Sequence, residues 1–315
     1  MFMINDFSIL IPAFNVDKYI DKCIQSILNQ SHANFEVIII DDGSTDETLK
    51  ICKKYESIDS RIKVFHQLNM GIVETRNRLI KLANGNWVVF IDADDYVKEN
   101  YLSCFTNYIN EFPDADVFVC DYITWEKGDE FKEIKRPFQS KQEYLLQLLG
   151  WRCANTALWA KVIKKELIEN NHIEFVKGIS LGEDLCFMSR LFYNAKDIIY
   201  VSEENYIWNR TNVLSMTKSE KYQDDAIALY EAIAKFYKEK SDYNLYSKTL
   251  SNTIVHVMEG RYIFQRKKTF GDLPSLINVT QLNLLNRLKF YLIINDLFIA
   301  ERLVEKINRS IKKML

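Results

Sequence analysis

The chain has 315 residues, of which 48% are hydrophobic and 27% are charged, with 9 glycines and 4 prolines. This length allows one large domain with an appendage or two domains, and the composition is that of a globular protein without long flexible linkers. The formal net charge of -2 provides no overall attraction for nucleic acid, so we expect any bound anion to be held by local groups.

The cysteines and both ends of the chain argue against a secreted or membrane-spanning protein. The N-terminal apolar run has no basic segment before it and is interrupted by Pro12, so no signal peptide is expected. The apolar segment 290–300 is too short to span a bilayer and contains Asp296. Scattered cysteines without a CxxC pair indicate reduced thiols in a cytosolic protein rather than disulfides or a zinc site. The six are Cys23, Cys52, Cys104, Cys120, Cys153 and Cys186.

Up to about residue 121, short β-branched runs alternate with longer amphipathic segments, which is typical of βαβ units and a parallel sheet. Apolar residues spaced by three or four predict a helix in each of the first three gaps. Ser44 followed by Glu47 predicts a capping box at the start of the second helix. The expected strands are residues 7–12, 35–41, 62–66, 87–92 and 116–122.

The pattern changes beyond this half. A polar hairpin is expected around Gly128, then a helix from about Lys141 and another within 181–195, where the apolar residues repeat like one helix face. From about residue 218 only long helices are predicted, with a single clear break at Gly271 and Pro274.

The expected fold class is therefore α/β. A Rossmann-like, mostly parallel sheet flanked by helices should occupy residues 1–217, and a helical C-terminal extension should follow over 218–315.

Acidic residues end two of the buried strands. One strand ends in Asp41 and Asp42, and another in Asp92, Asp94 and Asp95. Ligands of an open α/β sheet bind outside the carboxyl ends of its strands, so these side chains should converge there. Crowded carboxylates repel one another unless a divalent cation joins them, and such a cation suits a diphosphate-bearing substrate. Aspartates also end strands and cap helices, so a purely structural explanation stays open for either group alone.

Four motifs strengthen the functional interpretation. They are SILIPAFN from residue 8, IIIDDGSTDET from residue 38, GIVETRNRLIKLANGNWVVFIDADD from residue 71 and GEDLCF from residue 182. In order and spacing they resemble the motif series of glycosyltransferase family 2, a group of inverting sugar transferases with the GT-A fold. The resemblance covers roughly residues 7–215. It implies a nucleotide-binding half at 1–121 and an acceptor-binding half at 122–217.

The resemblance implies a nucleotide site at the ends of the first two strands. The loop Pro12, Ala13, Phe14 and Asn15 would edge the base. Asp42 would accept the N3 hydrogen of a pyrimidine, which suits an ionised carboxylate because it only accepts hydrogen bonds.

Two residues near that site have structural alternatives. Asp41 is assigned a structural or turn role, next to the tight turn that Gly43 permits. Arg76 would lie on the face of the base and the diphosphate, and its alternative is an exposed helix arginine.

The segment Asp92, Ala93 and Asp94 would be the family's metal-binding signature. By the resemblance, Asp92 would hold the ribose and the water ligands of the metal, and Asp94 would chelate the metal directly. Asp95 would add a ligand or cap the next segment. Mn²⁺ or Mg²⁺ is the expected ion, because oxygen ligands and a diphosphate select hard cations.

An inverting transfer needs one base to take the proton of the acceptor hydroxyl, while the metal assists the leaving group. The family pattern places this base on Asp184, with Glu183 as the second candidate or as a residue that holds an acceptor hydroxyl. Both acids also favour a helix N-terminus through its dipole, which is the structural alternative.

Other residues have weaker assignments. The resemblance suggests that Arg210 and Ser215 close over the diphosphate, since an arginine fork suits phosphate oxygens, although Asn209 is an insertion relative to the usual spacing. Trp151 and Trp159 are candidates for stacking on acceptor sugars, with core packing as the alternative.

The last stretch combines an apolar stripe with an excess of cations. Such a helix can lie on an anionic membrane, which would suit a lipid-linked acceptor on the inner face of the cell membrane, or pack on the catalytic domain or on a second subunit of a homodimer. The apolar positions are Leu288, Leu292, Phe298, Leu303, Ile307 and Ile311. The cations are Arg287, Lys289, Arg302, Lys306, Arg309, Lys312 and Lys313.

The sequence thus predicts a cytoplasmic, metal-dependent transferase that moves a hexose or hexosamine from a UDP donor to a glycan or lipid-linked acceptor. Processive synthases of the family carry membrane spans and a QxxRW motif, and neither is found here, so single additions in capsule, O-antigen or related polysaccharide synthesis are expected. The alternatives are a nucleotidyltransferase, whose Gly-rich phosphate loop is missing after the first strand, and a degenerate module that binds without catalysis.

Overall fold

A computed structural model describes residues 6–126, 130–135, 137–150, 157–212, 222–265 and 270–295. The chain divides into two compact units. The first contains residues 1–145 and 153–218, and the second contains 146–152 and 219–315. The sequence predicts that the catalytic domain ends at residue 217, and this division by function remains a prediction.

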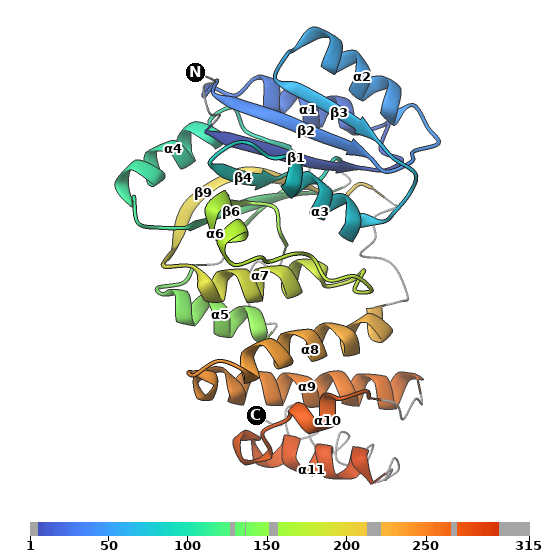
Figure 1. The fold of residues 1–315 in the computed structure, drawn as a ribbon, viewed down its shortest axis with the longest axis vertical. Coiled ribbons are helices and arrows are strands. Elements are labelled where there is room, and N and C mark those ends of the chain that lie inside the picture. The colour runs from blue at the N-terminus through green and yellow to red at the C-terminus, as the bar shows by residue number, and fades with distance from the viewer. Residues whose placement is uncertain are drawn as a thin grey trace. The chain divides into compact units, whose positions relative to one another are not determined.

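The first unit is built on a mixed sheet with strand order β3-β2-β1-β4-β8-β6-β9-β5, and β7 pairs with β6 at the side. Figure 1 shows this sheet with helices on both of its faces. The strands are β1 Phe7–Ala13, β2 Phe35–Asp41, β3 Ile62–His66, β4 Trp87–Phe90, β5 Tyr96–Val97, β6 Val117–Glu126, β7 Glu130–Ile134, β8 Lys161–Lys164 and β9 Ile198–Asn209. All five expected strands are present, and β6 and β7 form the expected hairpin.

Strand direction decides what meets at each edge of the sheet. β1 pairs in parallel with both β2 and β4, and β2 with β3. β8 runs antiparallel to both β4 and β6, while β6 and β9 are parallel. The carboxyl ends of β1, β2, β4 and β9 therefore lie at one edge, together with the amino end of β8.

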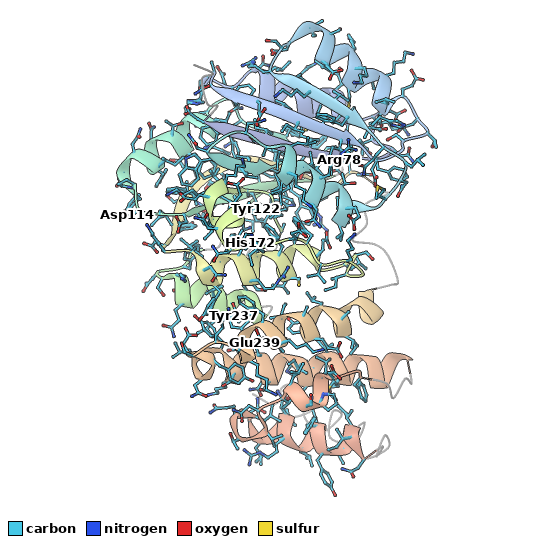
Figure 2. The ribbon with its side chains drawn as sticks, viewed as in Figure 1. Arg78, Asp114, Tyr122, His172, Tyr237 and Glu239 are labelled. Atoms are coloured by element: carbon cyan, nitrogen blue, oxygen red, sulfur yellow. The ribbon has the colours of Figure 1, made fainter. Side chains whose placement is uncertain are left out.

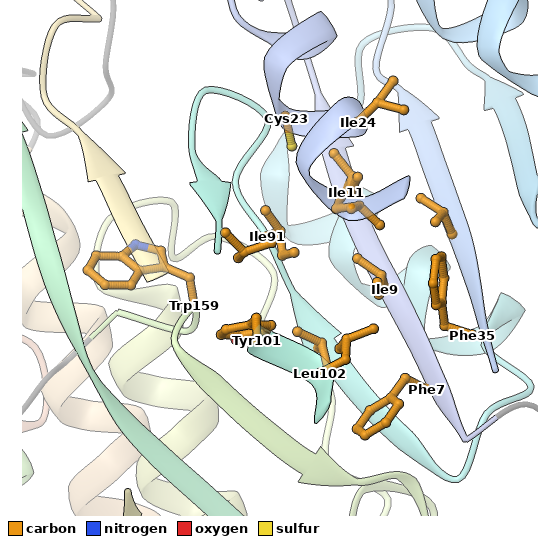
Figure 3. Packing of buried hydrophobic residues seen from close by; sticks show 14 of the residues in the cluster. Phe7, Ile9, Ile11, Cys23, Ile24, Phe35, Ile91, Tyr101, Leu102 and Trp159 are labelled. Atoms are coloured by element: carbon orange, nitrogen blue, oxygen red, sulfur yellow. The ribbon is translucent and has the colours of Figure 1, made fainter. Parts of the chain in front are cut away.

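The main core covers one face of this sheet (Figure 3). Alternate residues of β1, Phe7, Ile9 and Ile11, join it, while Leu10 between them is also fully buried and faces the other side. Such burial on both faces explains why β1 and β2 are continuous apolar runs.

The expected helices are present, and α4 and α6 are additional to them. The helices up to residue 218 are α1 Ile20–Leu28, α2 Thr48–Ile58, α3 Ile72–Leu82, α4 Tyr101–Glu111, α5 Lys141–Leu149, α6 Lys165–Asn170 and α7 Glu183–Asn194, and residues 146–149 of α5 belong to the second unit. A chain of aromatic rings ties α7 to the sheet. Phe90 of β4 lies 6.2 Å from Phe175, centroid to centroid, and Phe175 stacks at 4.2 Å on Phe187 of α7. This packing fixes where the first turn of α7 lies.

The expected capping box of α2 is wrong. The helix begins at Thr48, and the side chain of Asp46, not Ser44, accepts the Thr48 N–H at 3.0 Å. Ser44 instead accepts the backbone N–H of Asn15 at 2.9 Å, so this hydroxyl ties two loops together rather than starting a helix.

The described part of the second unit is helical. Its elements are α8 Tyr222–Lys238, α9 Tyr243–Gln265, α10 Leu273–Leu276, the 3₁₀ turn η2 Val279–Gln281 and α11 Leu284–Ile294. The prediction of a single break is wrong, because α8 and α9 are also separated, by residues 239–242. Pro274 lies in the first turn of α10, where its missing N–H costs nothing.

Two sequence expectations concern thiols and membrane spans. Cys23, Cys52, Cys104, Cys120 and Cys186 are thiols without disulfide partners, and Cys153 lies outside the described residues. None of the described helices combines the length and apolarity that a bilayer crossing requires.

Part of the expected basic stripe is buried. Lys289 is 4% exposed and donates to Glu259 Oε1, so it does not belong to a solvent-facing cationic surface. Leu292 is buried whereas Leu288 is 44% exposed, and the remaining apolar positions of the stripe, from Phe298 onward, lie outside the described residues. Membrane contact therefore stays a prediction.

The ion pair of Glu259 and Lys289 should make the free energy of unfolding depend on pH. Burial acts to raise the pKa of Glu259, but hydrogen bonds from His256 and Lys289 outweigh it and lower this pKa below its ordinary value. The stabilisation should be complete above the unfolded-state pKa of about 4.3 and should disappear as the pH falls through the lower folded-state value. Glu259→Gln should cost about 3–5 kcal/mol at neutral pH, because Lys289 stays buried without a counter-charge.

Urea unfolding of wild type and variant at neutral and acidic pH measures this. Glu239→Gln is the matched control, because Glu239 is exposed on the turn after α8 (Figure 2) and its change should cost under about 0.5 kcal/mol. If Glu259→Gln lowers the free energy of unfolding as much at acidic pH as at neutral pH, the ion pair is not the source of the pH dependence.

Candidate active site

The loops at the carboxyl edge of the sheet carry most of the sequence-predicted site residues. Pro12–Asn15 ends β1, and Asn15 has a φ of 51°, a left-handed conformation that asparagine tolerates. The loop is tied to the end of β2, because Asp42 N–H donates to Ala13 O at 2.8 Å and Thr45 N–H to Asn15 Oδ1 at 2.8 Å. Phe14 is 46% exposed, which is unusual for a large apolar side chain beside a buried strand.

Asp42 is buried and organises the loop after β3. Its Oδ1 accepts from Gln67 Nε2 and from Met70 N–H, both at 2.8 Å, and its Oδ2 accepts from Gly71 N–H at 2.9 Å. A carboxylate offers about four acceptor positions, so room for one further donor remains. Gln67 is in turn fixed by Arg78, which donates to its Oε1 at 2.7 Å (Figure 2).

Asp41 and Gly43, on either side of Asp42, shape the turn. Asp41 Oδ2 accepts the Ser44 N–H at 3.3 Å and lies 2.7 Å from His66 Nδ1, in agreement with its expected turn role. Gly43 has a φ of +79°, and a Cβ there would lie 2.7 Å from the backbone nitrogen of Asn69. Both the conformation and the close approach therefore require glycine.

The three aspartates after β4 do come together. Ligand oxygens of Asp92, Asp94 and Asp95 lie within 4.8 Å of one another. Asp95 is 2% exposed, and both its oxygens are engaged, one by Tyr206 O–H at 2.6 Å and the other by Asn209 N–H at 2.8 Å. Asp95 therefore anchors β9 to the loop, whereas Asp92 and Asp94 are partly exposed.

Asn209 and Asn212 support Asp94. Asn209 Nδ2 donates to the Asp94 carbonyl at 3.0 Å, and Asn212 Nδ2 donates to Asp94 Oδ2 at 2.8 Å. Asn209, which is an insertion relative to the family's usual spacing, therefore supports the segment Asp92–Asp95, called the acidic loop below. Ser215 and Trp151 lie outside the described residues. Arg210 lies over the Trp208 ring at 5.1 Å.

Arg76 joins the acidic loop to α7. Its Nη1 donates to Glu183 Oε1 at 2.7 Å and to Asp184 Oδ1 at 2.5 Å, and its Nη2 lies 3.5 Å from Asp92 Oδ1. The residue is 4% exposed, so the alternative of an exposed helix arginine is wrong. These carboxylates hold the pKa of the guanidinium above its ordinary value despite its burial.

The two acids at the start of α7 differ in exposure. Glu183 has a side chain that is 8% exposed, against 18% for Asp184. Burial, with the charge of Asp184, raises the pKa of Glu183 to about 7. Asp184 Oδ2 also accepts the Leu158 N–H at 3.0 Å, so each of its oxygens is held by one donor.

The acidic loop fits a hard divalent cation. Burial raises the pKa values of Asp92, Asp94 and Asp95, and for Asp92 and Asp95 the neighbouring carboxylates raise it further. A cation reverses this effect by favouring the ionised forms. Asp92 and Asp94 are the two partly exposed oxygen donors, so they fit such an ion, whereas Asp95, at 2% exposure, is less accessible to one.

Trp159 belongs to the core. It is 6% exposed and stacks on Tyr206 at 4.7 Å with an interplanar angle of 8°. Tyr122 meets it edge-on, with 4.8 Å between the ring centroids. The acceptor-stacking interpretation of Trp159 is therefore wrong, and the ring supports Tyr206 instead.

The model of glycosyl transferase family 2 matches residues 8–170, which include Pro12–Asn15 and Asp92–Asp95. The chain belongs to glycosyltransferase family 2. EpsH of Bacillus subtilis, which is assigned to the glycosyltransferases, is 30% identical over 258 residues, 79% of this chain and 74% of EpsH.

Solved structures of glycosyltransferases share the fold. Residues 1–349 of TarS from Staphylococcus aureus, in complex with UDP-GlcNAc, superpose with a TM-score of 0.82 at 22% identity, over 97% of this chain and 92% of that one. The mannosyltransferase PcManGT from Pyrobaculum calidifontis, in complex with GDP-Man and Mn²⁺, gives 0.52 at 13% identity over 86% and 72%. The transferase therefore has the GT-A fold with C-terminal helices.

Sequence motifs did not reveal several residues of the transferase's site. Tyr206, Asn209 and Asn212 hold the acidic loop from more than 110 residues away, and Leu158 contacts Asp184 through its backbone. The acidic loop was the one indication of these residues in the sequence, because buried carboxylates require hydrogen-bond donors from other segments.

Removing the Tyr206 hydroxyl tests the anchoring of this loop. Tyr206→Phe leaves a buried oxygen of Asp95 unpaired and should lower the free energy of unfolding by about 1–3 kcal/mol, as measured by urea unfolding. Tyr55→Phe is the matched control, because Tyr55 O–H donates to the partly exposed Asp21 at 2.7 Å and its loss should cost under about 1 kcal/mol. Equal losses in the two variants would show that Tyr206 does not hold the loop.

Proposed function

We propose that this transferase moves a hexose or hexosamine from a UDP donor to a hydroxyl of a glycan or lipid-linked acceptor, with inversion and with a divalent cation. The observation that carries the proposal is the arrangement at one sheet edge. Asp92, whose neighbour Asp94 is also partly exposed, and the two acids at the start of α7 all lie against Arg76 there.

The donor side of the proposal rests on the two loops. The Pro12–Asn15 loop with the exposed Phe14 would receive the base, and the remaining acceptor position of Asp42 would take a pyrimidine N–H. TarS is named a poly(ribitol-phosphate) β-N-acetylglucosaminyltransferase and its structure contains UDP-GlcNAc, which supports a UDP-linked hexosamine here. Further contacts with the sugar donor are proposed for Arg76 and Ala93. Arg210 and Ser215 are proposed to close over its diphosphate.

Asp92 and Asp94 would hold the cation, with Mn²⁺ favoured by analogy with PcManGT and Mg²⁺ as the second choice. The bound ion would act as a Lewis acid on the diphosphate leaving group. Asp95 contributes by keeping the loop in place through β9.

Asp184 is proposed as the base that takes the proton of the acceptor hydroxyl. It is more exposed than Glu183, and its carboxylate is oriented by one donor on each oxygen, which leaves further acceptor positions for a hydroxyl. Glu183, buried against Arg76, would set the position of the guanidinium rather than take the proton.

The acceptor is proposed to belong to bacterial surface-polysaccharide synthesis, as the names of the relatives suggest. A cytoplasmic location, peripheral on the membrane through the C-terminal tail, and a homodimer are parts of the same proposal. The intact Asp42, Asp94 and Asp184 support a catalyst over a degenerate module, and the contact of Arg76 with Asp184 is a further support.

The cation site is tested by binding. Calorimetry of UDP and UDP-sugars with Mn²⁺ should show binding that Asp94→Ala weakens by more than the roughly 10- to 100-fold that loss of a residue supporting a metal ligand costs. Asp114→Ala is the matched control, because Asp114 is exposed after α4 and its change should leave affinity unaltered (Figure 2).

A wild-type protein that binds no nucleotide sugar in the presence of Mn²⁺, or transfers none to any hydroxyl acceptor, would refute the proposed function. Metal-independent binding that Asp94→Ala leaves intact would refute the cation site alone.

A further inference from the structure

A lysine is buried inside the sheet next to the proposed base. Lys161 begins β8, pairs in register with Val119 of β6, and is 0% exposed. Its ammonium donates to the carbonyl oxygen of Ala157. Among the residues that the structure describes, no carboxylate forms an ion pair with it, although the charge of Asp184 acts on it.

Burial of this kind is costly. Desolvation lowers the pKa of Lys161 to about 7, against the opposing influence of Cys120 and Asp184. An apolar side chain of similar volume would fill the same place in the sheet without that cost, and such replacements are often neutral or stabilising. Core packing therefore does not account for an ammonium at this position.

One peptide unit connects the lysine to the base. The carbonyl of Ala157, which accepts from Lys161, and the N–H of Leu158, which donates to Asp184 Oδ2 at 3.0 Å, belong to the same peptide bond. In a trans peptide these two groups point in opposite directions, so the ammonium and the carboxylate lie at opposite ends of one dipole. The positive charge is at the carbonyl end and the negative charge at the N–H end, so both contacts are favourable and reinforce each other.

We propose that Lys161 is a positioning residue for Asp184, which it orients through the Ala157–Leu158 peptide. This inference rests on the proposed function, in which Asp184 is the base. Arg76 holds Oδ1 of this carboxylate and the Leu158 N–H holds Oδ2. Without the ammonium the peptide loses the group that fixes its carbonyl, so the Leu158 N–H that donates to Oδ2 is no longer held in one orientation.

The consequence is specific to catalysis. Among the described residues, no hydrogen bond or ion pair joins Lys161 to Pro12–Asn15 or to Asp92–Asp95, so donor binding should not depend on it. A misplaced base slows the chemical step, whereas the affinities for donor and acceptor stay near those of the wild type.

Lys161→Met tests this in the full chain, with steady-state transfer from the UDP-sugar that calorimetry identifies. We expect kcat to fall by about 10- to 100-fold, with the acceptor KM and the Kd for UDP and Mn²⁺ within twofold and the Tm unchanged or higher. If Lys161→Met does not fold, Lys161→Gln is measured instead. Lys164→Met is the matched control, because Lys164 lies on the same strand with a partly exposed side chain 3.8 Å from Asp116, and its kcat should stay within twofold.

A double variant separates positioning from general damage. In an Asp184→Asn background, Lys161→Met should lower the residual rate by less than twofold, because the charge that the peptide orients is gone. Equal losses in both backgrounds, or a kcat of Lys161→Met within twofold of wild type, would overturn the inference while leaving the proposed function intact. A wild type without transfer activity would instead refute the proposed function.

Discussion

Arg76 donates to carboxylates from two distant parts of the chain, and its burial leaves the guanidinium no alternative partners in water. Asp92 follows β4, while Glu183 and Asp184 begin α7 more than 90 residues later. A buried arginine without counter-charges would be strongly destabilising, and so would these acids without the arginine. The pairs therefore require each other, and the acidic loop and the helix start are held in a fixed relation.

The directions of the strands bring the residues of the site to one edge of the sheet. Parallel β1, β2 and β4 bring the Pro12–Asn15 loop, Asp42 and Asp92–Asp95 to one edge, and antiparallel β8 brings its amino end, with Lys161, to the same edge. β9 holds Asp95 from the side through Tyr206 and Asn209. The proposed functional groups are thus supported by regular strands.

Local patterns predicted the strands, the hairpin and the grouping of Asp92, Asp94 and Asp95, because runs of β-branched apolar residues and the acids that follow them are visible in neighbouring positions. The contacts that hold the site were not predictable in that way, since Asn212 and Asp94, or Arg76 and Asp184, are joined only by the tertiary fold. One signal was available for Arg76: it lies three residues after Val73 and three before Leu79, on the buried face of α3. The α2 cap failed for a local reason, because Asp46 competes with Ser44 for the same helix start.

Arg76 joins Asp92, Glu183 and the proposed base Asp184 in one electrostatic unit, and Arg76→Lys tests this arrangement. A lysine supplies the same charge as a compact point and lacks the planar fork that reaches several carboxylates at once. We predict that kcat at saturating donor, acceptor and Mn²⁺ falls by more than about 100-fold. A kcat within twofold of the wild type would contradict it.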